Sequence, residues 1–237
     1  MDIIPKYVND SWINFIENEN NIKVLQDVRN RIGSDFYPKN DEVLRFLETD
    51  LNNAKCVLMG MDPYKQGYKD LDQILPVATG RSFEVRSLSS WNDKVNRSLM
   101  NILKKIYCIY NNCNDVSITK VRCDINNGEF DILQPSELFN NLEDQGVIFL
   151  NSSLTLIPNV SGSHMKYWKD FMDLVIIYMT DVNPDMKWLL FGVDAQNRVK
   201  DFVKEENCIY AKHPVSNSFV KGESFERVRE IKWNGLK

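Results

Sequence analysis

Polar side chains follow three short apolar runs of this chain, close to the point where each run ends. Asp62 comes after CVLMG, Asn151 after GVIFL, and His213 after NCIYA. A carboxylate can act as a base or as a countercharge to a developing cation, a carboxamide can read a hydrogen-bonding edge, and an imidazole can donate a proton. Because ligands bind outside the carboxyl ends of the strands in an open α/β sheet, we expect these side chains to form one site.

Each of these residues also has an ordinary structural interpretation. Asp62 followed by Pro63 is a common turn former, Asn151 could simply end a strand, and a single histidine such as His213 is more often structural than functional. The convergence of the strand ends is therefore what favours a site over three unrelated turns.

The elements that must position these residues follow from the apolar patterns. The three runs and a fourth, WLLFG, are short and almost entirely apolar, which is typical of buried parallel strands. We predict strands at 55–60, 146–150, 187–191 and 208–211. We predict helices at 12–32 with one break, 41–47, 91–110, 134–142, 165–179, 194–203 and 223–233. Residues 65–82 are predicted to form a long loop and 111–130 a turn-rich segment.

Strands that alternate with helices indicate parallel βαβ units. The predicted fold class is α/β, with three α/β/α layers and a central four-stranded, mostly parallel sheet. The length of 237 residues suits one α/β domain, so residues 1–237 are expected to form a single domain.

The net charge of the chain argues against a protein that coats nucleic acid nonspecifically. A net charge of −4 and a pI near 5.4 do not suit a nonspecific nucleic-acid coat protein, but they do not exclude a DNA enzyme. Ten basic residues could form a phosphate-facing rim if they border the strand-end crevice; the alternative is an ordinary solvated surface of mixed charge. They are Arg81, Arg86, Lys94, Arg97, Lys104, Lys105, Lys212, Lys221, Arg227 and Arg229.

Cysteine usage and hydropathy indicate the cellular setting. The five cysteines form no CxxC pair, which argues against a disulfide framework, a zinc site or an iron–sulfur cluster. The opening residues lack the basic and long apolar regions of a signal peptide, and no apolar run approaches the roughly 20 residues of a membrane span. We expect a soluble, intracellular monomer without a membrane partner, cytoplasmic if the source is bacterial.

In the order and spacing of four segments, the chain is similar to the family-1 uracil-DNA glycosylases. KCVLMGMDPY resembles the family's water-activating motif, and GVIFLNSSLT resembles its G-V-L-L-L-N-x-x-L-T motif. WLLFGVDAQ resembles the glycine–serine loop, and AKHPVSNS resembles the H-P-S-P-L-S loop. The resemblance runs from about residue 12 to residue 233.

The resemblance implies a DNA glycosylase domain that flips deoxyuridine out of single- or double-stranded DNA and hydrolyses its N-glycosidic bond, leaving an abasic site. As catalytic residues, Asp62 would orient the attacking water and stabilise the cationic sugar, and His213 would donate a hydrogen bond to the leaving base. Asn151 would read the pyrimidine edge, Phe83 would stack on the ring, and Tyr64 would crowd carbon 5 so that thymine is refused. The resemblance implies no metal and no cofactor.

The chain departs from the family pattern at several positions. Met61, Lys65 and Val193 stand where the family has Gln, His and Ser. Met61 is still expected beside the base. The predicted DNA contacts are Lys65, Ser98, Gly192, Val193, Ser216 and Asn217.

The DNA-inserting wedge is where the chain resembles the family least. The family's leucine wedge aligns near Asn217, although Val215 or Phe219 of the same loop could replace it. The proline-rich loop that pinches a phosphate is absent, which leaves Ser98 as its possible hydroxyl.

The stretch 65–82 is longer than the family's equivalent. It could be a neutral surface elaboration, or it could reshape the pocket for a base larger than uracil. Three functions therefore stay open: a uracil-DNA glycosylase; a glycosylase of the same mechanism that excises a bulky modified pyrimidine, such as a modified phage cytosine, in anti-phage defence; and a DNA-binding or partner-docking module with weakened catalysis.

Overall fold

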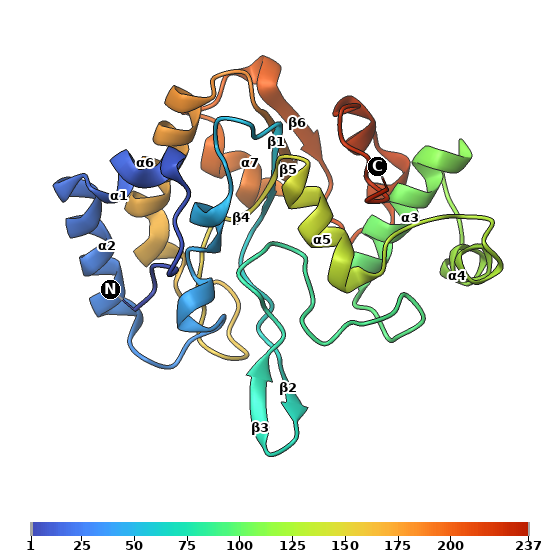
Figure 1. Cartoon of the computed structure of the whole chain (residues 1–237), viewed down its shortest axis with the longest axis horizontal. Coiled ribbons are helices and arrows are strands. Elements are labelled where there is room, and N and C mark those ends of the chain that lie inside the picture. Colours follow the sequence, from blue (N-terminus) through green and yellow to red (C-terminus); the bar gives the residue numbers. More distant parts are fainter. Residues whose placement is uncertain (1, 237) are drawn as a thin grey trace.

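A four-stranded parallel sheet lies at the centre of the protein (Figure 1). The structure is a computed structural model that describes residues 2–236. The sheet order is β4 (Val147–Asn151), β1 (Cys56–Gly60), β5 (Lys187–Phe191) and β6 (Cys208–Ala211), and every neighbouring pair is parallel. All residues of β1 and β4 are buried, as expected for strands with no polar side chain before their last residue. The predicted α/β fold is confirmed.

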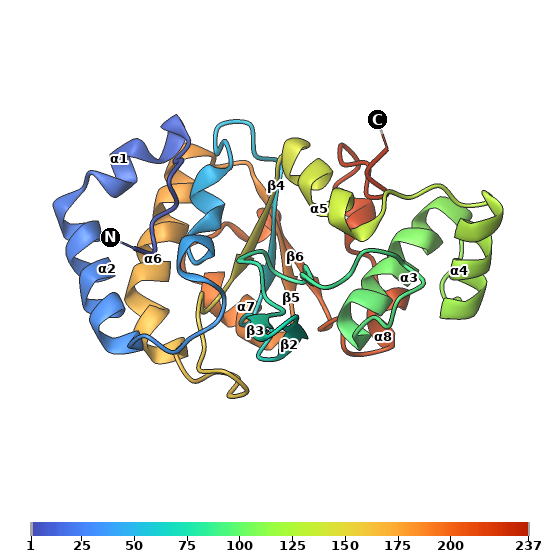
Figure 2. The same ribbon diagram turned by 60° about the horizontal axis from the view of Figure 1, so that its bottom comes forward.

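Helices cover both faces of the sheet (Figure 2). Alternate residues of each strand enter opposite cores: Val57 and Met59 of β1 face one, and Cys56 and Leu58 face the other. The first core is covered by α1 (Ile13–Ile16), α2 (Glu19–Ile32), α6 (Met165–Val182) and α7 (Val193–Val199). The second is covered by α3 (Arg97–Asn111), α4 (Ile118–Asn127), α5 (Pro135–Asp144) and α8 (Ser218–Lys221).

Helix caps explain several boundaries. Asn18 accepts hydrogen bonds from the N–H groups of Asn20 and Asn21, so the predicted break within 12–32 falls directly before α2. The start predicted at residue 91 is wrong, because Asn96 caps the Leu99 N–H and α3 begins at Arg97. The turn-rich prediction for 111–130 is also wrong. Ser117 caps α4, and Gly128 ends it at a positive φ of 72°.

Three other predicted helices are shorter or looser than expected. Residues 41–47 form two 3₁₀ turns, Asn40–Glu42 and Arg45–Glu48, because Leu44 leaves the helical region at ψ 34°. The helix predicted at 194–203 ends at Val199, where a tight turn bonds the Phe202 N–H to the Val199 carbonyl. In 223–233 only the 3₁₀ turn Phe225–Arg227 forms, because Val228 is non-helical.

The stretch predicted to be a long loop contains a β-hairpin. Strands β2 (Gly67–Asp70) and β3 (Gln73–Pro76) pair antiparallel and stand out from the body at the bottom of Figure 1. Two further 3₁₀ turns, Asp10–Trp12 and Glu205–Asn207, complete the short elements of the described chain.

Candidate active site

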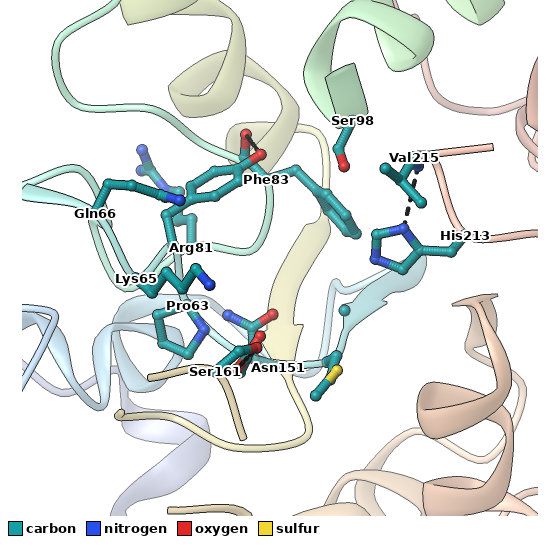
Figure 3. Close-up of a pocket in the computed structure, with 14 residues that line it drawn as sticks. Pro63, Lys65, Gln66, Arg81, Phe83, Ser98, Asn151, Ser161, His213 and Val215 are labelled. Atoms are coloured by element: carbon teal, nitrogen blue, oxygen red, sulfur yellow. Dashed lines mark hydrogen bonds between the residues drawn. The ribbon is translucent and has the colours of Figure 1, made fainter. Parts of the chain in front are cut away.

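A cavity of about 410 Å³ opens at the carboxyl ends of the central strands (Figure 3). Its lining brings together Asp62 after β1, Asn151 at the end of β4 and His213 after β6. The same cavity holds Tyr64 and Phe83. The strand ends therefore meet as their order predicted, because parallel strands present their carboxyl ends at one edge of the sheet.

Asp62 is held by the loop between β4 and α6. Its Oδ2 accepts hydrogen bonds from the Ser161 hydroxyl and the Gly162 N–H, each 2.7 Å long. The Asn159 N–H also donates to the Lys65 carbonyl at 2.8 Å, which ties this loop to the segment after Asp62. One carboxylate oxygen is thus committed to the protein, and Oδ1 has no hydrogen bond within residues 2–236. Ser161 was not predicted, since its loop carries no recognisable pattern.

Asn151 is only 3% exposed, yet its side chain makes no hydrogen bond within the described chain. It stands opposite Gly60 in the register of β1 and β4. A Cβ at position 60 would lie 2.6 Å from the Asn151 Oδ1, so only glycine leaves room for the carboxamide. Because Asn151 lines the cavity and its amide has no protein partner within residues 2–236, the amide is available to a ligand.

His213 is presented as a neutral hydrogen-bond donor. Its Nδ1 accepts a hydrogen bond from the Val215 N–H at 3.1 Å, so the proton of the neutral ring is assigned to Nε2 (Figure 3). Burial lowers the pKa of His213, although the negative charges of Asp194 and Asp62 act in the opposite direction. Burial and the backbone contact together favour the uncharged imidazole.

The loop that carries His213 is fixed from two sides. The Asn101 side chain donates to the carbonyls of Pro214 at 2.6 Å and Ser216 at 3.3 Å. Gly192, at φ 94°, lies so close that a Cβ there would approach the His213 Cβ to 3.2 Å. Asn101 was not predicted, because it resembled a residue on the solvent face of its helix. The structure buries that face against the C-terminal segment.

Two aromatic rings shape the cavity walls. Phe83 has a positive φ of 65°, and its ring centroid lies 5.6 Å from that of Phe191 and 6.3 Å from that of His213. The Tyr64 hydroxyl lies 3.4 Å from the Phe83 carbonyl and 3.3 Å from the Asn96 Oδ1. Burial raises the pKa of the Tyr64 hydroxyl, so it remains a donor to these acceptors. Both rings are therefore held in place before any ligand binds.

The remaining predicted residues divide into two groups. Met61, Lys65 and Ser98 line the cavity. Gly192, Val193, Ser216 and Asn217 lie outside its lining, near the His213 loop and the start of α7. The Asn217 side chain accepts a hydrogen bond from Arg97 at 3.2 Å.

Of the three wedge candidates, Phe219 is wrong. It is 1% exposed and packs against Phe191 and Phe225, so it cannot enter DNA without opening the core. Val215 is exposed and lines the cavity beside His213. The sequence could not separate these two residues, because burial in this loop depends on contacts with β5.

The predicted basic rim is partly wrong, because four of its ten members are paired with carboxylates. Arg81 binds Glu84 and Glu143, Arg86 binds Glu42, Lys104 binds Asp115, and Lys105 binds Glu226. The other six are exposed and form no ion pair within residues 2–236: Lys94, Arg97, Lys212, Lys221, Arg227 and Arg229. Arg81, which was predicted for the rim, and Gln66, which was not predicted for the site, also line the cavity.

The second histidine lies outside the cavity. His164 is buried, its Nδ1 lies 2.9 Å from the Thr155 hydroxyl, and burial lowers its pKa. The same hydroxyl accepts the Trp168 indole N–H at 2.7 Å. His164 therefore joins the start of α6 to the loop after β4.

The described residues hold no group of three or more His, Cys, Asp or Glu side chains that could bind a metal ion. All five cysteines are free thiols. No helix within residues 2–236 is both long enough and apolar enough to cross a membrane.

The sequence and the fold are similar to those of known uracil-DNA glycosylases. No family model matches the chain. It is 25% identical over 235 residues to the uracil-DNA glycosylase of Helicobacter pylori, an alignment that covers 93% of this chain and 89% of that protein. The UNG structure from Nitratifractor salsuginis matches with a TM-score of 0.71 and 20% identity, covering 94% of this chain and 92% of that one. The mimivirus uracil-DNA glycosylase matches with a TM-score of 0.65 and 21% identity, covering 86% and 68%.

Proposed function

We propose that this chain, a divergent relative of the uracil-DNA glycosylases, is a monofunctional DNA glycosylase. Its partner would be DNA, and its reaction the hydrolysis of the N-glycosidic bond of a flipped pyrimidine nucleotide, most simply deoxyuridine. The observation that carries the proposal is the meeting of Asp62, Asn151 and His213 in one cavity, with Phe83 and Tyr64 as its aromatic walls.

In the proposed reaction, charge separates between the sugar and the base. The bond between C1′ and the base nitrogen breaks, and its electron pair leaves with the base. The free Oδ1 of Asp62 would stabilise the cationic sugar and orient a water, whose oxygen bonds to C1′. The proton that the water loses ends on the departing base. His213 would donate from Nε2 to a carbonyl oxygen of that base while negative charge develops there.

Base recognition would fall to the buried carboxamide of Asn151. One acceptor and two donors can match adjacent complementary groups on a pyrimidine edge, and the amide has no competing protein partner within the described residues. Tyr64 supports uracil over a base with a bulky carbon-5 group, because the contacts of its hydroxyl hold the ring in the cavity wall. Phe83 would stack on the base.

The β2–β3 hairpin supports a second candidate. Lys65 and Gln66, which lead into β2, line the cavity, so the inserted segment borders the proposed base site. A glycosylase for a bulky modified pyrimidine would use the same chemistry, and the inserted segment would leave room in the cavity for the larger base. The fixed position of Tyr64 is the observation against it.

The test is base release from defined DNA. The protein is incubated with single- and double-stranded oligonucleotides that contain one deoxyuridine, and with DNA that contains bulky carbon-5-modified cytosines. Alkali then cleaves any abasic site. Release from deoxyuridine DNA alone supports the first candidate, and release from the modified DNA alone supports the second. Intact strands in every case, at high enzyme concentration, would refute a glycosylase and leave a DNA-binding or docking module.

A further inference from the structure

The β2–β3 hairpin is an anchored projection beside the cavity. At its neck, the Val77 N–H donates to the Gln66 carbonyl at 3.0 Å. Arg86 clamps the returning strand by donating to the carbonyls of Pro76 at 2.9 Å and Ala78 at 2.8 Å, and Glu42 neutralises its charge. The hairpin therefore leaves the body in a defined direction, and its far end projects away from the other elements (Figure 1).

Leu71, at the tip of the hairpin, has both an unfavourable backbone conformation and an exposed apolar side chain. Leu71 adopts a positive φ of 52°, a region that disfavours a side chain, and it is 88% exposed. Ile74, which pairs with Lys69 across the hairpin, is 64% exposed. A strained and exposed leucine at the tip of an anchored hairpin, whose neck residues Lys65 and Gln66 line the cavity, is a reason to look for a binding role.

We propose that this hairpin is a second DNA contact, in which Leu71 packs against bases that flank the flipped nucleotide. The inference rests on the proposed function, because a nucleotide seated in the cavity brings its neighbours to the cavity mouth. Each strand of the hairpin has four residues, which at about 3.3 Å each give a reach of about 13 Å. That distance corresponds to about four base steps of a duplex.

The charges at the tip favour bases over phosphates as the contact. Asp70 and Asp72 flank Leu71 and would repel a phosphate placed directly against the tip. A two-stranded β-ribbon fits a major groove, where aspartate can accept from cytosine and apolar side chains can contact thymine methyl groups. The cations of the first strand and its approach, Lys65 and Lys69, lie nearer the body and are exposed for contact with the backbone.

Equilibrium binding tests the proposal. The probe is a fluorescent duplex with one 2′-fluoro-2′-deoxyuridine, whose glycosidic bond resists cleavage, and affinity is read from anisotropy at several salt concentrations. Leu71→Ala should weaken binding about tenfold, because it removes most of an apolar contact, without changing the salt dependence. Leu71→Gly should weaken it as much while relieving the backbone strain, which separates the lost contact from any loss of folding.

Two further variants complete the design. Ile177→Ala removes a similar aliphatic side chain, 41% exposed on α6, and should leave affinity unchanged. Lys69→Ala should reduce the slope of log affinity against log salt by about one, the value expected for the loss of one phosphate contact.

Unchanged affinity in both Leu71 variants would overturn the proposal. A wild-type protein that binds the duplex but releases no base from any DNA would refute the proposed function alone, since the anisotropy measurement needs no turnover.

Discussion

Asp62 and Asn151 lie at or just after the ends of strands that are buried along their length, whereas the hairpin that begins beside them ends in an exposed leucine. In the cavity, Asp62, Asn151 and His213 are each placed by the sheet or by a backbone contact to a neighbouring loop. In the hairpin, placement depends on the clamp of Arg86 at the neck. A reaction that must align a sugar, a water and a base needs the first kind of support, whereas a flanking contact tolerates the second.

This difference predicts a division of labour. Substitutions in the cavity should change the rate of base release and leave DNA affinity nearly intact. Substitutions in the hairpin should change affinity and leave the rate at saturation intact. The predictions below test the cavity side, in order of decreasing effect.

Asp62→Asn should have the largest effect, lowering the single-turnover rate at saturation by about a thousandfold or more, because it removes the charge that stabilises the cationic sugar. The amide has nearly the same shape and can still accept from the Gly162 N–H. DNA affinity should be unchanged or higher, since a negative charge near phosphates is lost. The measurement is alkaline cleavage of a deoxyuridine oligonucleotide together with anisotropy. A rate within about tenfold of the wild type would remove Asp62 from the reaction.

His213→Ala should lower the same rate by roughly 100- to 1000-fold, the usual cost of one missing donor to a developing anion. Here the chain offers a matched control, since its other histidine lies outside the cavity. His164→Asn keeps a polar group near Thr155 and should lower the melting temperature more than the rate at saturation. If both variants lost rate in proportion to lost stability, His213 would be structural.

The same division explains which features could be predicted from the sequence. The strands were evident because four apolar runs are each uninterrupted by polar residues, and their order implied that Asp62, Asn151 and His213 would meet. Burial on both faces leaves such runs few alternatives. The roles of the cavity residues stay predictions until base release is measured.

Features that depend on partners distant in sequence were missed. Arg81 and Arg86 resembled free phosphate ligands, but Glu143 and Glu42, far along the chain, neutralise them. The helix α4 was missed because its asparagine-rich flanks resemble turns. Its contacts with distant residues offset that tendency: Val121 packs into the core, and Asp124 accepts a hydrogen bond from the Tyr107 hydroxyl. Local composition cannot report contacts of this kind.

Tyr64→Ala should have a smaller effect, and on preference rather than rate. If the cavity accepts uracil, opening the wall beside carbon 5 should narrow the ratio of uracil to thymine release by about 10- to 100-fold, since a methyl-sized difference is worth roughly 1–3 kcal/mol. The matched variant Tyr64→Phe keeps the ring but loses the hydroxyl contacts, and it should narrow the ratio less than the alanine variant does. Release is compared on paired oligonucleotides that differ only in the target base. An unchanged ratio in the alanine variant, with modified cytosines released, would favour the enlarged pocket.

The smallest effect concerns the pH dependence set by His213. The neutral ring accepts the Val215 N–H at Nδ1, and protonation of that nitrogen would break the contact. Because burial lowers the pKa of His213 from its usual value of 6.5, activity should persist below that pH and be lost as the pH falls through the lowered pKa. The charge of Asp194 raises the pKa, so Asp194→Asn should lower it further and move the acid limb of kcat/KM to lower pH.

Asp194 is exposed, so this shift should shrink as salt is added and should be nearly absent at about 1 M, where the Debye length is near 3 Å. The control Asp201→Asn changes another exposed aspartate, one that does not contribute to the pKa shift of His213, and should leave the limb in place. A limb that stayed in place or moved to higher pH in Asp194→Asn would mean that the group titrating there is not one whose protonated form Asp194 stabilises. The acid limb would then belong to a residue other than His213, and the comparison between the rigid catalytic cavity and the peripheral hairpin would have to include that residue.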